Sequence, residues 1–111
     1  MFTVVETPTF IRRAEKLLLE KDRENLIDYL AAFPFAGNFI PDTGGVRKVR
    51  YAARSKGKSG GVRVIYYVVD DDTPLYALLI YGKGEQGDLA PEQKKAIRAF
   101  AGAIKAARRK S

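Results

Sequence analysis

The fold of this chain is decided by residues 46–83, which read VRKVRYAARSKGKSGGVRVIYYVVDDDTPLYALLIYGK. Three runs in this stretch, at residues 46–53, 61–70 and 74–83, are rich in Val, Ile and Tyr with a period of two. Such runs are typical of β-strands. The connections, KGKSG at 56–60 and DDDT at 70–73, are too short for a parallel crossover. The three strands are therefore predicted to form an antiparallel meander.

Two helices are predicted before this meander, after a short β-prone run at residues 2–5. Thr7 suits the N-cap of the first helix and Pro8 its first position. The second helix is predicted to begin with Asp22 as its cap and to stop at Pro34. Apolar residues recur at helical spacing in both: Phe10, Ala14, Leu17 and Leu18 in the first, and Leu26, Ile27, Leu30 and Phe33 in the second. The pair is expected to form an αα-hairpin.

The segment at residues 34–45 is rich in Gly, Pro, Asn and Asp and is interpreted as an irregular connection. A last helix is predicted from Pro91 to about residue 109, with its basic residues mostly on the outer face. Its apolar face would consist of Ile97, Phe100, Ala101 and Ile104. The predicted class is α+β with element order β-α-α-β-β-β-α, a small antiparallel sheet with helices packed on one face. Residues 1–111 are predicted to form a single domain.

The composition excludes several kinds of chemistry. The chain has no cysteine, which excludes a disulfide framework, Cys-ligated zinc and thiol catalysis. It has no histidine, which excludes a Ser-His-Asp triad, an imidazole acid/base and a histidine-ligated metal. Any chemistry must come from Lys, Arg, Tyr, Asp or Glu, and no metal or cofactor is expected.

Membrane and export signals are also missing from the sequence pattern. The first ten residues lack a basic segment followed by an apolar run, so they do not resemble a signal peptide. The longest apolar stretches, at 64–69 and 75–81, are too short to span a bilayer. A cytoplasmic protein with no membrane partner is predicted.

The net charge of +7 is unevenly distributed. Residues 1–45 hold five basic and seven acidic groups, whereas residues 46–69 hold seven basic groups and no acidic one. Seven more basic residues lie between 94 and 110. Cations on both arms and the connection of one hairpin concentrate positive potential on one edge of the domain, which favours a polyanion and RNA in particular.

Alternation along the predicted strands sorts these cations by face. Lys48, Arg50 and Arg54 should project together, and Arg47 should point the other way. Arg63 interrupts an apolar strand, which indicates either a sheet edge or a functional face. Tyr81 and Lys83 should share one face at the end of the last strand, where a role in a site and a role in the core are both open.

Two local patterns invite sharper interpretations. The turn containing Lys56, Gly57, Lys58 and Ser59 lacks the first glycine of a Walker A loop, because Ala52 stands there, and it joins two strands instead of a strand and a helix. A solvated turn and a clamp on a phosphate backbone stay open for it. The Asp70–Asp72 run fits a solvated turn better than a metal site, and the C-terminal cations fit a solvated helix face or an RNA contact.

Three segments together carry a resemblance. Residues 37–50 (GNFIPDTGGVRKVR), 57–67 (GKSGGVRVIYY) and 81–89 (YGKGEQGDL) resemble, in that order, the RelE/HigB family of bacterial type II toxins, and most closely its HigB-2-like branch. The resemblance covers essentially the whole chain. It implies a small α+β toxin that enters the A site of the 70S ribosome and cuts the bound mRNA. It also implies a cognate antitoxin, commonly with a helix-turn-helix domain, and contact with operator DNA only through the antitoxin complex.

The resemblance also implies roles for single residues. The paired basic residues of the family's second strand correspond to Lys48 and Arg50, the arginine of its Gly-x-Arg-x-x-Tyr strand to Arg63, and the basic residue after its last strand to Lys83. The tyrosine that RelE has near its C-terminus has no counterpart, since Leu89 and Ala90 occupy that region, so the general base stays open. The remaining cations and one tyrosine are expected to bind RNA: Arg47, Arg54, Lys56, Lys58, Tyr81, Lys105, Arg108 and Arg109.

Cleavage without histidine or metal is chemically reasonable. RNA carries its own nucleophile, the 2′-OH, so the enzyme must align it, stabilise negative charge and help protons move. Arg50 and Arg63 suit phosphate contacts, and Lys48 or Lys83 could act as base because neighbouring cations lower the pKa of a lysine. A metal-independent endoribonuclease is therefore the favoured prediction. The alternatives are a ParE-like toxin that acts on DNA gyrase without a nuclease site, and a non-catalytic module that binds RNA or antitoxin.

Overall fold

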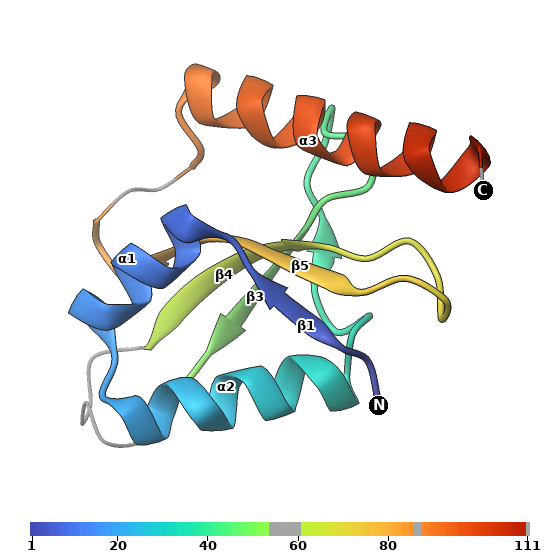
Figure 1. Ribbon diagram of the computed structural model, residues 1–111. Helices are drawn as coiled ribbons and strands as arrows, with labels where there is room; N and C mark the ends of the chain where they lie inside the picture. The colour runs from blue at the N-terminus through green and yellow to red at the C-terminus, as the bar shows by residue number, and fades with distance from the viewer. Residues whose placement is uncertain (54–60, 86–87, 111) are drawn as a thin grey trace.

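The computed structural model describes residues 1–53, 61–85 and 88–110, without the side chains of 109 and 110. The fold is mixed α+β (Figure 1). In chain order the elements are β1 (Val4–Glu6), α1 (Pro8–Leu17), α2 (Glu20–Ala32), β2 (Asn38–Phe39), β3 (Arg47–Tyr51), β4 (Val62–Tyr67), β5 (Leu75–Gly82) and α3 (Pro91–Lys110). The predicted order is confirmed, with the short strand β2 added from the segment interpreted as irregular.

The sheet has the strand order β1-β5-β4-β3-β2. The predicted meander is confirmed, since β3 pairs antiparallel with β4 and β4 with β5. The prediction of an antiparallel sheet is wrong for β1, which lies parallel to β5 with Val4 opposite Leu75. The physical reason is the long segment between β1 and β5, which contains α1, α2 and the other three strands. A segment of this length can cross over the sheet and bring β5 back parallel to β1.

The helices cover both faces of the sheet, and the expectation that they pack on one face is wrong. The helices α1 and α2 lie on one side in Figure 1 and α3 on the other. Phe10, Ala14 and Leu26 pack in one apolar cluster with Val64 of β4. Ile97 and Ala101 of α3 belong to a second cluster, which contains Ile65, Tyr67, Leu79 and Tyr81. Because β4 and β5 are apolar on both faces, each face needs its own cover.

The two predicted helix starts have different outcomes. Thr7 is the N-cap of α1, as predicted, and its hydroxyl accepts a hydrogen bond from the N–H of Phe10. The second helix begins at Glu20 with Leu19 as its cap residue and no side-chain cap. Asp22 is therefore not a cap but a buried residue of the first turn. An acidic side chain in a first turn is favourable through the helix dipole without being a cap, which explains the error.

Replacing Thr7 with alanine should lower the free energy of unfolding by about 0.5–2 kcal/mol, as is typical for the loss of an N-cap. The hydroxyl also donates to the carbonyl of Ala77 at 3.0 Å, which ties α1 to β5. Urea unfolding measures the change. The matched control is Thr9→Ala, an exposed threonine two residues away in the same helix. An equal loss in both variants would show that the cap contributes nothing of its own.

No helix within the described residues is long and apolar enough to cross a membrane.

Candidate nucleic-acid interface

A row of three polar side chains crosses the sheet on the face covered by α3. Arg50 of β3 lies directly opposite Arg63 of β4, and Arg63 lies opposite Tyr81 of β5. Tyr81 packs in the α3 cluster, so the alternation of the strands places Arg63 and Arg50 on the same face. Like charges directly opposite each other destabilise a sheet. A polyanion held across the two arginines would offset this repulsion.

A cleft opens beside this row, at the side of Tyr81 and Lys48. Lys48 precedes Arg50 by two residues and shares its face, as the sequence predicts. The cleft has a volume of about 300 Å³ and takes its walls from the β2–β3 connection, the sheet, the segment before α3 and the start of that helix. The residues that line it are Ile40, Pro41, Lys48, Tyr81, Asp88, Leu89 and Lys94. Among the described residues, the charged side chains that line it are two lysines and one aspartate.

Tyr81 is the one tyrosine in the lining of this cleft, and its side chain is almost fully buried. Burial raises the pKa of the Tyr81 hydroxyl; the positive charge of Arg63 lowers it by a smaller amount, and the negative charge of Asp88 raises it. The net direction is upward. The hydroxyl is therefore protonated at neutral pH, where it can donate a hydrogen bond or a proton but is a poor base.

Arg47 points to the opposite face and does not reach the cleft. Its guanidinium lies 4.1 Å from the ring centre of Phe39 and 5.3 Å from that of Phe35. It donates hydrogen bonds to the carbonyls of Phe35 and Gly37. These contacts give Arg47 a structural role, in which it holds the segment before β3 against the sheet.

The basic residues of α3 that the sequence assigns to RNA mostly contact other parts of this chain. Arg108 forms ion pairs with Asp70 and Asp72 of the β4–β5 connection, and Lys105 donates to the carbonyl of Gly44. Partial desolvation would raise the pKa of Asp70, but hydrogen bonds from Arg108, from the N–H of Asp72 and from Thr73 outweigh it and lower the pKa. Lys105 and Arg108 thus tie α3 to the two loops beneath it.

Lys83 is exposed in the turn after β5, where strand alternation no longer applies. It lines a separate pocket with Leu17 of α1 and Gly61, away from Lys48. The structure therefore brings together Lys48, Arg50, Arg63 and Tyr81 and leaves Lys83 outside this group. The predicted RNA contacts at Arg54, Lys56 and Lys58, and the side chain of Arg109, lie outside the described residues.

Asp88 and Lys94 line the cleft but are not among the sequence-derived site residues. Lys94 looks like one of several cations on the outer face of a helix, and no periodicity distinguishes it from Lys95. Its proximity to Lys48 depends on how the segment before α3 crosses the sheet. In the described ranges, no three His, Cys, Asp or Glu side chains gather closely enough to hold a metal ion.

Comparison with known proteins gives a fold relationship. No protein-family model matches the chain. A solved structure of the E. coli toxin RelE, a double arginine-to-alanine variant in the free state, is 20% identical, with a TM-score of 0.59 over 86% of this chain and 97% of that one. A crystal structure of the isolated E. coli RelE toxin, in a P21 form, is 15% identical, with a TM-score of 0.52 over 90% of this chain and 99% of that one. At these identities the likeness shows a shared fold.

Proposed function

We propose that this chain, which has the fold of the E. coli toxin RelE, is the toxin of a type II toxin–antitoxin pair of the HigB kind and cuts mRNA in the ribosomal A site. The observation that carries the proposal is the cross-strand row of Arg50, Arg63 and Tyr81 beside the cleft that contains Lys48. The family motifs assign three of these four positions, Lys48, Arg50 and Arg63, to catalysis. The proposed functional unit is one domain spanning residues 1–111.

The reaction requires no cofactor in this proposal, because RNA supplies the nucleophile. Attack of the 2′-oxygen on the adjacent phosphorus forms a 2′,3′-cyclic phosphate and breaks the bond to the 5′-oxygen of the next nucleotide. In this proposal Arg50 and Arg63, which lie opposite each other on adjacent strands, stabilise the charge that develops on the phosphate oxygens. The proton that leaves the 2′-OH needs a base, and this role is assigned to Lys48, one of the two lysines among the described residues that line the cleft. Tyr81 is protonated and can donate to the leaving 5′-oxygen.

The proposed partners follow from this role. The toxin would act on the 70S ribosome with its mRNA and would be neutralised by a cognate antitoxin, through which alone it would contact operator DNA. A gyrase poison of the ParE kind and a module that only binds RNA are the competing functions. The paired arginines favour cleavage, because a repulsive cross-strand pair is costly to keep on a surface that handles no phosphate.

Expression of the chain without an antitoxin should stop protein synthesis before DNA synthesis. Pulse labelling with an amino acid and with thymidine measures the order of the two effects. Primer extension on mRNA in a translating extract should show new 5′ ends that appear only when ribosomes are present. An early halt of DNA synthesis with continuing translation would favour the gyrase poison, and a translation block without new mRNA ends would favour the module that only binds RNA.

A further inference from the structure

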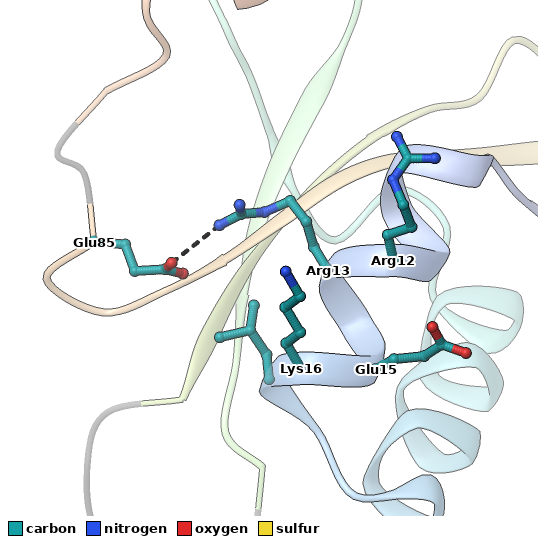
Figure 2. Close-up of a pocket in the computed structure, with 6 residues that line it drawn as sticks. Arg12, Arg13, Glu15, Lys16 and Glu85 are labelled. Carbon is teal, nitrogen blue, oxygen red and sulfur yellow. Dashed lines mark hydrogen bonds and ion pairs between the residues drawn. The ribbon is translucent and has the colours of Figure 1, made fainter.

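A second basic groove lies on the α1 side of the sheet, the face opposite to the cleft. A cavity of about 340 Å³ lies between α1 and the turn that follows β5 (Figure 2), lined by Arg12, Arg13, Glu15, Lys16, Leu17 and Glu85. A neighbouring cavity of about 220 Å³ shares Leu17 and Glu85 with it and adds Lys83. The two cavities adjoin at Leu17 and Glu85, and together they are called the α1 groove here.

One ion pair gives this groove a fixed wall. Arg13 reaches from α1 to Glu85 at 3.0 Å and also donates to the carbonyl of Ile80 (Figure 2). Glu85 in turn accepts a hydrogen bond from the N–H of Gly82. Arg13 and Glu85 therefore neutralise each other and hold the turn with Lys83 against α1.

The remaining charges of the groove are mainly positive. Arg12 and Lys16 lie one helical turn apart on α1, and neither forms an ion pair with any residue in the described ranges. Figure 2 shows Lys16 beside Arg13, whereas Glu15 extends in the opposite direction. Two cations at this spacing destabilise a helix, and a bound anion would relieve their repulsion.

The lining favours a nucleic acid over a protein as the occupant. Protein interfaces depend on large apolar or aromatic anchors seated in pockets. Among the described residues, Leu17 is the only apolar one that lines the larger cavity, and the smaller cavity adds Ala53 and Val62 but no aromatic side chain. Interfaces with nucleic acids are more polar and far more positive. The basic residues Lys105 and Arg108 of α3 are engaged with the chain itself, so the α1 groove has the more available charge.

We propose that the groove formed by Arg12, Lys16 and Lys83 binds the phosphate backbone of ribosomal RNA. The choice of ribosomal RNA rests on the proposed function, while the preference for a phosphate backbone rests on the charges and the lining. This groove then holds the protein on the ribosome, and the row on the other face contacts the mRNA. Arg12 and Lys16 belong to residues 1–45, which are net acidic, so the charge of that segment gives no sign of a basic surface there.

The test is binding of the purified protein to 70S ribosomes over a series of KCl concentrations, measured by co-sedimentation. The double variant Arg12→Gln/Lys16→Gln removes two charges, keeps good helix formers and leaves Arg13 and Glu85 in place. The matched control is Lys21→Gln/Lys95→Gln, which removes two exposed lysines from α2 and α3. The groove variant should bind more weakly and lose about 1.4–1.8 from the slope of log K against log [KCl], and the control should retain the wild-type slope.

Each other outcome has a definite meaning. Equal slopes for the groove variant and the wild type, or equal losses in variant and control, would overturn the assignment. If the wild-type protein does not bind ribosomes, the assignment of the groove to ribosomal RNA is likewise overturned. Normal ribosome binding with loss of binding to the cognate antitoxin would assign the groove to a protein partner. A groove-dependent slope without any mRNA cleavage would sustain the groove and refute the proposed nuclease activity.

Discussion

Replacement of Arg63 by alanine is expected to slow mRNA cleavage by roughly a hundred- to a thousand-fold. Arg63 is the middle member of the cross-strand row, directly between Arg50 and Tyr81. Removal of one group that stabilises a developing negative charge typically costs about 2.7–4 kcal/mol of transition-state stabilisation. Single-turnover cleavage of mRNA at saturating ribosome concentration measures this loss without interference from weaker ribosome binding.

The fold should survive this change, because alanine removes a like charge opposite Arg50. Unfolding by urea verifies that the variant is native. The matched control is Arg98→Ala, an exposed arginine of α3 that donates to the carbonyl of Asp42 and takes no part in the row. The control should cleave at close to the wild-type rate. If folded Arg63→Ala also cleaves at that rate, the phosphate-stabilising group lies elsewhere.

Replacement of Gly61 by alanine is expected to lower the free energy of unfolding by roughly 2–6 kcal/mol. Gly61 has a φ of 71°, a left-handed conformation that alanine adopts only with strain. A Cβ atom here would also collide with the backbone carbonyl oxygen of Tyr51 on β3. The obstacle is backbone, not the end of a flexible side chain, so the strands must separate to admit a methyl group.

The matched control for this variant is Gly102→Ala in α3. Gly102 has open space around the position of a Cβ atom, and its backbone is helical. Alanine there should raise stability by about 0.5–1 kcal/mol through helix propensity. Urea unfolding of both variants should therefore give changes of opposite sign. A Gly61→Ala variant as stable as the wild type would mean that β3 and β4 do not meet at this point in solution.

The sequence predicts the meander well because short connections and alternation are local signals. The shared face of Lys48 and Arg50 follows from the period of a strand in the same way. The last helix is predicted, but its position on the second face of the sheet is not. The signal for this position is present, because VRVIYY and LYALLIYG are apolar on successive residues, which is typical of strands buried on both faces. In β4 and β5 the chain has these continuous apolar runs in place of the predicted period of two, so the need for a helix on the second face is not recognised.

The candidate site is only partly predictable for a different reason. Arg63 lies between Arg50 and Tyr81 because of the register in which β3, β4 and β5 pair. The lengths of the connections between the strands set this register, and the sequence of one strand does not show it. The ion pairs of Arg108 join positions more than thirty residues apart, and no local pattern shows that this arginine is engaged. Lys83 lies apart from Lys48, Arg50 and Arg63 because the strand ends one residue before it, so its predicted role stays a prediction.

The parallel pairing of β1 with β5 has a consequence for the order in which the molecule assembles. Val4 and Leu75 lie 71 positions apart in the sequence, so the pairing of β1 with β5 closes a long loop that contains the other strands. Contacts of such sequence separation slow folding, because the loop entropy is lost before the pairing is gained. A nascent chain that ends before β5 also lacks Tyr81, and hence a wall of the cleft. The cleft that carries the proposed activity can therefore form only after β5 has joined the sheet.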